Sequence, residues 1–377
     1  MYMNRKGGRE KSGSRWIIRI ELIVLLAFVC AAISRELKGR IDLGLEDADT
    51  GGGWGSDTGE AIEVSSTGDY IKWVEFHATC EALAAAYDLD VATYQEEVHL
   101  DWIELLAYVG AKHGGKFDTG SVKEINEAAE KLRSNETTMK KLTEGMEYYE
   151  YYLEAYSAIL SGMVGEFSLK EEEEWNEYYG LKAFSPVAKG FDYSHYDDFG
   201  ASRSYGYSRP HLGHDMMGQI GTPIIAVESG VVEALGWNQY GGWRIGIRSF
   251  DGKRYYYYAH LRQNYPYAEG LEEGSVVTAG DVIGYMGHTG YSVEENVNNI
   301  ETVHLHWGLQ LIFDESQKEG NNEIWIDCYE LTKFLYRNRS EVYKVEDSKE
   351  WRRAREMEDP EVEKHCKIDT PMIQSHL

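Results

Sequence analysis

The chain has 377 residues, which gives room for two domains of ordinary size, and 42% of the residues are hydrophobic, which is enough to form a buried core. Its formal net charge of −26 at pH 7 argues against nucleic acid as a partner, because binding phosphates requires clustered lysine and arginine side chains. The same charge disfavours electrostatic attachment to anionic polymers. The 4 cysteines are widely spaced without a Cys-x-x-Cys pair, so neither a disulfide framework nor a zinc knuckle is predicted.

The amino-terminal segment predicts a membrane-directed helix. Residues 1–15 are rich in lysine and arginine, and residues 16–36 are mostly apolar, although their uncharged part (22–33) is short for a full span. This pattern is typical of a signal peptide or of a signal anchor. We expect an uncleaved single-pass anchor in the cell membrane, with 1–15 as a cytoplasmic tail and the rest of the chain extracytoplasmic. Secretion after cleavage is the alternative.

Residues 37–68 are rich in glycine and acidic side chains, which predicts a flexible acidic linker. From 69 to 180 the pattern becomes helical, because apolar residues recur at spacings of three and four along 73–87, 98–109 and 142–160. We therefore predict a small all-α bundle over 69–180, in which 142–160 forms one long helix.

Two capping boxes are expected within this bundle, Ser121 with Glu124 and Ser168 with Glu171, each at the start of a helix. Residues 171–174 would then form a solvated helix face. The histidines of the segment lack a convincing ligand spacing, and a structural or surface role is expected for His77, His99 and His113.

Residues 181–345 have the texture of a β domain, with short β-prone runs between glycine turns. The runs 245–250 and 253–259 are joined by Asp251-Gly252, which predicts a hairpin. Strands at such short spacing predict a mostly antiparallel sheet, and the fold class of the whole chain is α+β. The charged extension 346–377 is expected to form a surface helix or a partly ordered tail.

Histidine and aspartate residues recur in this β region at the spacings of a metal site. His304 and His306 would project together from a strand, since residues i and i+2 share a face. His211 and Asp215 share a face in either a strand or a helical turn, and His260 follows an aromatic, β-prone run. Two histidines and one carboxylate are the ligands of a catalytic zinc whose fourth position stays open.

On these motifs, His-x-x-x-Asp with a central glycine followed by His-x-His, the chain resembles the lysostaphin/LytM-type zinc endopeptidases, which are bacterial cell-wall metallopeptidases. The resemblance covers about residues 184–335 and is to a membrane-anchored, clostridial-like member. It implies that the ligands of Zn2+ are His211, Asp215 and His306. It also implies two catalytic histidines that do not bind the metal, His260 and His304.

The resemblance implies an enzyme that hydrolyses peptide bonds of bacterial peptidoglycan, in stem peptides or cross-bridges. On this hypothesis the zinc polarises the peptide carbonyl and lowers the pKa of a bound water. His304 would accept the proton of the water or give one to the leaving amine, and His260 would donate to the growing negative charge. No His-Glu-x-x-His motif occurs, so a histidine must replace the glutamate base.

Three further histidines and one loop complete the expected site. His214 would point away from His211 in a strand, whereas His195 and His288 are candidates to line the groove. Residues 291–303 separate the glycine turn from His-x-His, where the family usually has a shorter connection. We expect them to form a long loop at the rim.

Two other functions remain open. The first is a catalytically silent LytM-fold scaffold for an extracytoplasmic sporulation or division complex, with a protein partner bound through the helical segment. The second is a bifunctional enzyme with a glycosidase in the helical segment, for which single glutamates such as Glu97 or Glu104 are weak support. For the zinc enzyme, the short connection between the segments places the bundle near one end of the groove, either as a shield for the metal or as a spacer.

Overall fold

The computed structural model describes residues 74–205, 207–318 and 322–368. The predicted tail, anchor and linker fall in 1–68, outside these residues. Within the described ranges, no helix combines the length and the apolar character needed to cross a membrane. All of the described residues fall within one contact unit, 68–377.

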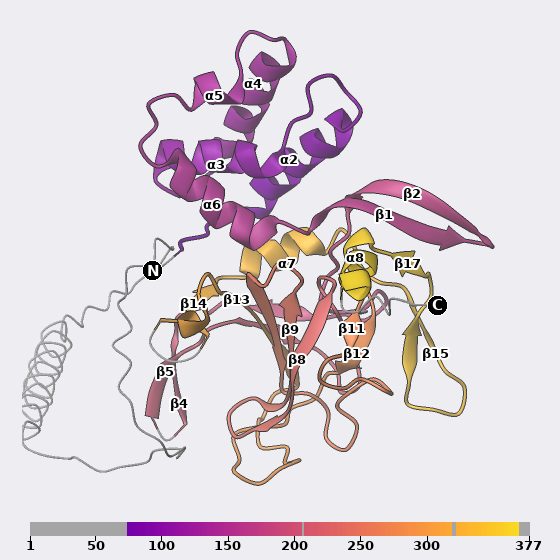
Figure 1. The fold of residues 1–377 in the computed structure, drawn as a ribbon. Helices are drawn as coiled ribbons and strands as arrows, with labels where there is room; N and C mark the ends of the chain where they lie inside the picture. Colours follow the sequence, from indigo (N-terminus) through magenta and orange to yellow (C-terminus); the bar gives the residue numbers. More distant parts are fainter. Residues whose placement is uncertain (1–73, 206, 319–321, 369–377) are drawn as a thin grey trace, which may run out of the picture. The chain divides into compact units, whose positions relative to one another are not determined.

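The predicted helical bundle occupies residues 80–160 (Figure 1). Asp101 caps the second of its described helices, α3, by accepting hydrogen bonds from the backbone N–H groups of Ile103 and Glu104, and Gly114 ends that helix in the left-handed conformation. The helices are α2 (Cys80–Thr93), α3 (Trp102–His113), α4 (Ser121–Arg133), α5 (Met139–Leu142) and α6 (Tyr149–Leu160).

The long helix expected over 142–160 is divided in two. The short helix α5 ends at Leu142, and α6 begins only at Tyr149. Between them Gly145 adopts a φ of 80°, which a continuing right-handed helix cannot accommodate. The apolar stripe was therefore a correct signal for burial and a wrong one for the length of the helix.

Neither expected capping box forms. Ser121 starts α4, but its hydroxyl accepts a hydrogen bond from the backbone N–H of Asp118 and makes no bond with Glu124. Ser168 and Glu171 lie in a strand, so the helix that they were expected to begin is absent.

The segment 164–181 is a β-hairpin where a helix was predicted. Strand β1 (Val164–Glu171) pairs antiparallel with β2 (Glu174–Leu181), and the expected solvated helix face is the exposed turn between them. Phe167 and Leu169 alternate with polar residues and pack into a small separate core, which is the period of a strand. Strand β17 (Met357–Glu358) joins β1 from the far end of the chain.

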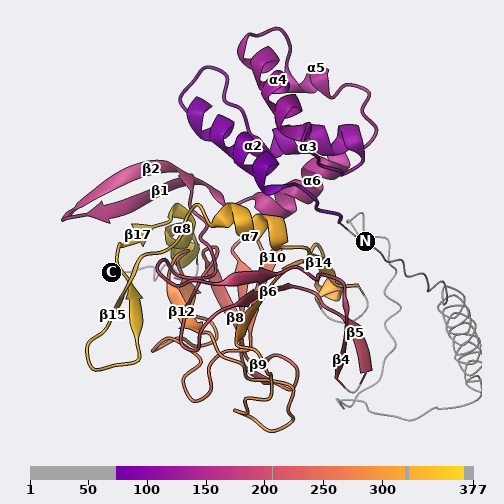
Figure 2. The same ribbon diagram turned by 180° about the vertical axis from the view of Figure 1, so that it is seen from behind.

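The main sheet is antiparallel, as predicted, and has the strand order β11-β8-β9-β10-β13-β6-β3, with β14 also paired to β13. Figure 2 labels β6, β8, β9, β10 and β14 of this sheet. The predicted hairpin is confirmed, because Tyr255 pairs with Arg248 and Tyr258 with Ile245. The strands are β3 (Ser194–Tyr196), β6 (His214–Met217), β8 (Gly230–Asn238), β9 (Gly242–Ser249), β10 (Arg254–Ala259), β11 (Val276–Val277), β13 (His304–Leu311) and β14 (Ile324–Ile326).

Smaller elements surround this sheet. Two further antiparallel pairs are β4 (Ser202–Tyr205) with β5 (Tyr207–Pro210), and β7 (Pro223–Ile225) with β12 (Val282–Tyr285). A 3-10 turn covers Glu315–Gln317, and helix α7 covers Tyr329–Leu335. The carboxy-terminal extension contains the pair β15 (Val342–Lys344) and β16 (Trp351–Arg353) and the predicted helix, α8 (Pro360–Ile368).

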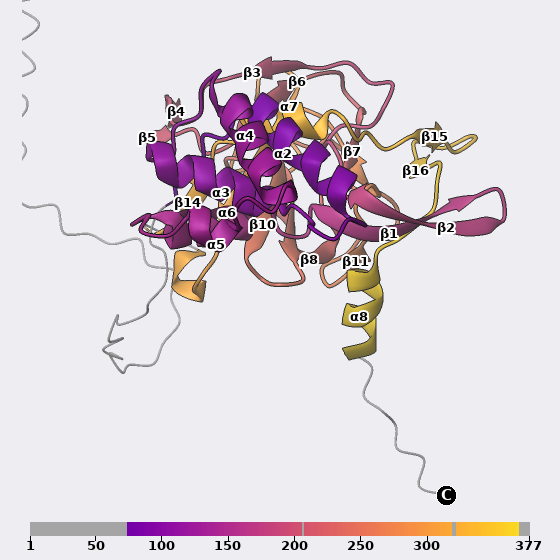
Figure 3. The ribbon, with the colours of Figure 1, turned by 90° about the horizontal axis from the view of Figure 1, so that it is seen from above.

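The helices pack on one face of the main sheet. Along β10, Tyr255, Tyr257 and Ala259 point to one face, and the residues between them point to the other. On that other face the Arg254 guanidinium binds the Glu228 carboxylate and donates to the carbonyl of Ala158 in α6. Helix α2 also contacts α7, which lies between the bundle and the strands (Figures 1 and 3). The bundle and the sheet therefore share one hydrophobic core.

Candidate metal centre and groove

The metal-site residues come from two neighbouring strands and the loop before them. His306 of β13 lies directly opposite Asp215 of β6, and His304 lies two residues earlier on the same face of β13. His211 precedes β6, and its backbone N–H donates to the carbonyl of Ala201. The pairing of β6 with β13 thus brings together residues ninety positions apart in the sequence.

Three side-chain atoms converge at this point. The Oδ1 atom of Asp215 is 3.0 Å from His211 Nε2 and 3.0 Å from His306 Nδ1, and these two nitrogens are 2.9 Å apart. Within the described part of the chain, this is the group of His, Cys, Asp or Glu side chains able to hold a metal ion. A cation would stabilise three such lone-pair-bearing atoms facing one another, and two imidazoles with one carboxylate are the donor set of a catalytic zinc.

The close packing around Gly213 explains why the first motif has a glycine at its centre. A Cβ atom at this position would lie 2.5 Å from both Cε1 and Nε2 of His306 and 2.9 Å from the carbonyl oxygen of Trp307. The backbone of residue 213 therefore packs directly against the imidazole, and its lack of a side chain leaves the ring its place.

A second layer of charged groups holds the first. The Nδ1 atom of His211 lies 2.8 Å from Asp198 Oδ1, at ion-pair distance, and the opposite ring atom, Nε2, faces Asp215 and His306. The guanidinium of Arg203 bridges the two carboxylates, at 2.6 Å from Asp198 and 3.2 Å from Asp215. Sequence reasoning did not identify Asp198 or Arg203, because neither has a spacing that marks it.

His260 and His304 stand side by side next to the ligand cluster. Their ring centroids are 4.7 Å apart, and His304 Nε2 is 3.7 Å from Asp215. Each ring places its Nδ1 against a backbone carbonyl, that of Thr289 for His260 and that of Thr302 for His304. Nε2 of both neutral rings therefore carries a lone pair. His260 has a φ of 61°, uncommon for a residue with a side chain, and this bend at the end of β10 directs the ring into the site.

Burial sets the protonation of these groups. Burial, with His304 and His306 nearby, lowers the pKa of His260 well below its usual range, and burial also lowers the pKa of His306. Burial alone would raise the pKa of Asp215, but the hydrogen bonds with His211 and His306 outweigh it and hold the pKa far below its usual range. At neutral pH the ionised carboxylate of Asp215 thus lies beside the neutral imidazoles of His260 and His306.

The cluster lies in a groove of about 1140 Å³ on the face of the sheet opposite the helices. All five predicted site residues line it, and the ends of the long loop 291–303 contribute Tyr291 and Thr302 to its wall, as expected. No residue of α2–α6 is among the lining residues, so the bundle does not form a wall of the groove. The bundle packs on the other face because its contacts are with α7 and Arg254.

The three other histidines considered for the groove, His195, His214 and His288, lie outside its lining. His214 points away from the site, as predicted, and its Nε2 is 2.7 Å from Nδ1 of His195. His288 binds the carbonyl of Ile300 through Nδ1. Neither His195 nor His288 lines the groove.

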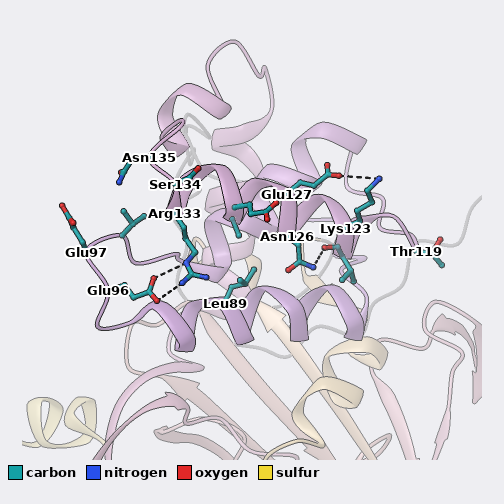
Figure 4. A pocket seen from close by; sticks show the side chains of 14 residues that line it. Leu89, Glu96, Glu97, Thr119, Lys123, Asn126, Glu127, Arg133, Ser134 and Asn135 are labelled. Atoms are coloured by element: carbon teal, nitrogen blue, oxygen red, sulfur yellow. Dashed lines mark hydrogen bonds and ion pairs between the residues drawn. The ribbon is translucent and has the colours of Figure 1, made fainter.

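A second hollow lies within the helical bundle, between α4 and the loop that follows α2 (Figure 4). Two ion pairs join charged residues of its lining: Arg133 pairs with Glu96, and Lys123 with Glu127. Of the two glutamates considered for a glycosidase, Glu97 lines the hollow and Glu104 does not. The hollow therefore does not bring these two candidates together.

Residues 209–322 match the model of Peptidase family M23. Over 148 residues the chain is 36% identical to the L-Ala--D-Glu endopeptidase of Bacillus subtilis (strain 168), which covers 39% of this chain and 44% of that protein. Over 89 residues it is 37% identical to lysostaphin of Staphylococcus simulans, which covers 23% of this chain and 17% of that protein. The chain thus spans less than half the length of either relative.

Two solved structures are also similar. A lytM protein of Ruminococcus gnavus has 26% sequence identity and a TM-score of 0.46, over 68% of this chain and 87% of that one. The catalytic domain of lysostaphin from Staphylococcus simulans has 30% identity and a TM-score of 0.29, over 37% of this chain and 92% of that one.

Proposed function

Starting from the match of residues 209–322 to peptidase family M23, we propose that this protein is a zinc-dependent endopeptidase that hydrolyses peptide bonds of bacterial peptidoglycan. The observation that carries the proposal is the convergence of His211, Asp215 and His306 within one groove. The similarity to the L-Ala--D-Glu endopeptidase of Bacillus subtilis supports the reaction class.

The residues present fit a zinc ion. His211 would bind through Nε2, His306 through Nδ1 and Asp215 through Oδ1, since these are the atoms that face one another. Zinc bound there would act as a Lewis acid toward the peptide carbonyl and make water more acidic. The contact of His211 with Asp198 supplies the outer partner that zinc-binding histidines usually have.

His304 is placed to move the proton. Its Nδ1 is directed to the carbonyl of Thr302, so Nε2 faces the groove with a free lone pair near Asp215. This atom would accept a proton from the attacking water and return it to the leaving amine. The sequence resemblance implied that His260 donates to the developing negative charge. Because Nδ1 of His260 is directed to Thr289, its Nε2 can donate only when the ring is protonated, which burial opposes. We therefore assign His260 to orienting the water or sharing its proton.

We retain an extracytoplasmic location, reached through the amino-terminal segment, as part of the proposal, because peptidoglycan lies outside the cytoplasm. The silent-scaffold alternative requires a site that has lost a ligand or a catalytic histidine, and all five residues line this groove. No observation favours the scaffold over the enzyme.

The test is digestion of purified peptidoglycan by the whole chain, loaded with zinc or stripped of it, with the released muropeptides identified by mass spectrometry. We expect zinc-dependent cleavage within peptides. His306→Ala should remove both zinc and activity, whereas His304→Ala should retain zinc and lose activity. Zinc loss in His304→Ala with retention in His306→Ala would reverse the assignment of the pair.

A further inference from the structure

Two guanidinium groups in the groove wall form no ion pair with any carboxylate of the described residues. Arg209 and Arg244 both line the groove, and the Nε atom of each is buried and meets no hydrogen-bond acceptor within the described residues. Burying a charged donor without an acceptor is destabilising. Because both buried Nε donors lie in a groove, they point to a ligand that supplies the missing hydrogen-bond acceptor.

The sheet register places Arg244 close to the metal centre. Ala259 lies opposite His306, and Tyr258 lies opposite Ile245, so Arg244 comes beside Ala259 on the face that carries His306. On this face of the sheet, the strand position between Arg244 and His306 is held by Ala259, whose side chain is a methyl group.

Arg209 approaches from the opposite side. It lies two residues before His211 and directly opposite Arg203 in the β4–β5 pair, an arrangement of like charges that is unfavourable on its own. Arg203 is neutralised by two carboxylates, whereas Arg209 stands over the rings of Tyr240 and Tyr291, at 4.8 and 5.6 Å from their centroids. The aromatic contacts fix the guanidinium without removing its charge.

Tyr257 connects the two arginines to the site. Tyr257 lines the same groove as Arg209 and Arg244; burial raises the pKa of its hydroxyl, and the charges of both arginines oppose that rise. The ring of Tyr257 meets that of His306 edge-on, with centroids 5.9 Å apart. The two cations therefore flank a residue in contact with a proposed zinc ligand.

The carboxylates of the groove do not neutralise this pair. Asp215 is held by the histidines and Arg203, and Glu323 accepts a hydrogen bond from the indole N–H of Trp325. Glu301 is exposed, and no ion pair joins it to either arginine among the described side chains. A chain of net charge −26 thus keeps a local positive site beside its metal centre.

We propose that Arg209 and Arg244 form an anion subsite that binds a carboxylate of the peptide next to the bond to be cut, which makes the groove selective for acidic peptides. This inference rests on the proposed peptidase function. Guanidinium groups suit carboxylates because they donate two parallel hydrogen bonds. The carboxylate could belong to an acidic side chain or to the peptide terminus, and the chemistry is the same.

The test compares synthetic stem peptides that differ in one group. One pair carries a Glu carboxylate or a Gln carboxamide, and a second pair has a free or an amidated carboxyl terminus. The whole zinc-loaded chain is measured beside Arg209→Gln, Arg244→Gln and the control Arg352→Gln, which removes the same charge from an exposed position on β16. Binding of the same peptides to the zinc-free chain is measured by calorimetry, and thermal melting reports folding.

We expect kcat/KM to be about 10- to 100-fold higher for the peptide with the carboxylate, the range of a charge-assisted hydrogen-bonded pair. Either groove variant should reduce this ratio to below about threefold, and Arg352→Gln should keep it. The pair that shows the preference identifies the source of the carboxylate. Equal rates for acid and amide in the wild-type chain, which need no variant, would overturn the inference and leave the peptidase intact.

The anion subsite and the proposed peptidase activity can be refuted separately. If no peptide is cleaved but the zinc-free chain binds the acidic peptide in an Arg209- and Arg244-dependent way, the subsite stands and the proposed activity falls. If cleavage occurs and Arg244→Gln slows acid and amide equally, the arginine has a structural role and the subsite is refuted. Arg244→Lys, which retains the charge, should restore part of the preference if folding of the Gln variant is impaired.

Discussion

Gly213→Ala probes the proposed metal centre without touching any of its ligands. The added Cβ would stand 2.5 Å from two ring atoms of His306, closer than carbon atoms approach in folded proteins, and 2.9 Å from the carbonyl of Trp307. The φ of Gly213 is not positive, so the alanine backbone is unstrained and the contact alone causes the effect. Overpacking of this kind costs about 1–3 kcal/mol. If the His306 ring gives way, zinc affinity falls by about 10- to 100-fold.

The assay is competition for zinc between the protein and a chromophoric chelator, with thermal unfolding measured on the same samples. Gly165→Ala is the matched control, because the nearest atoms that a Cβ there would meet are Lys182 side-chain atoms at 3.5 Å or more, and the φ of Gly165 is likewise not positive. We expect Gly165→Ala to bind zinc like the wild type. Wild-type zinc affinity in a folded Gly213→Ala variant would refute the close packing of residue 213 against a ligand.

Three other outcomes are expected. Asp198→Asn should weaken zinc binding about 10- to 100-fold by chelator competition, because it alters the contact that orients His211; unchanged affinity would remove Asp198 from the site. Glu228→Gln should lower the free energy of unfolding by about 3–5 kcal/mol in urea titrations, since it removes the buried carboxylate that binds the Arg254 guanidinium through two hydrogen bonds and leaves Asp251 as its remaining charged partner; a loss below 1 kcal/mol would contradict this. A fragment 181–345 should fail to show a cooperative melt, because the core that it shares with the helices would be exposed; a sharp melting transition would count against the shared core.

The positions of the five site residues were predictable because each depends on local geometry. Alternation along a strand places His304 and His306 on one face whatever the rest of the fold, and the hairpin around Asp251-Gly252 fixes the strand that ends at His260. The pairing of β6 with β13, in contrast, depends on the tertiary fold and not on local sequence. The resemblance to a family with both motifs made that pairing an expectation.

Other parts of the site depend on register across several strands. Arg244 reaches the groove because β9 pairs with β10 at one particular offset, and a shift by one residue would turn its side chain to the helical face. Asp198 lies in an irregular segment, where no period marks a residue that points inward. The hairpin 164–181 was misread because its glutamates suggested a solvated helix, whereas the alternation of Phe167 and Leu169 was the physical signal.

The position of the helices changes what they can do for the groove. A bundle that shields the metal centre would have to cover the opening of the groove. The helices instead contact the face of the sheet that is opposite the groove. Its link to the site is Arg254, which holds α6 and Glu228 together at the start of β10, the strand that ends beside His260. Because Tyr255, Tyr257 and Ala259 of the same strand form the groove floor, anchoring the strand from behind keeps that floor in register. The helices thus act as a structural support for the groove, and a change in them should alter stability before it alters access to the metal centre.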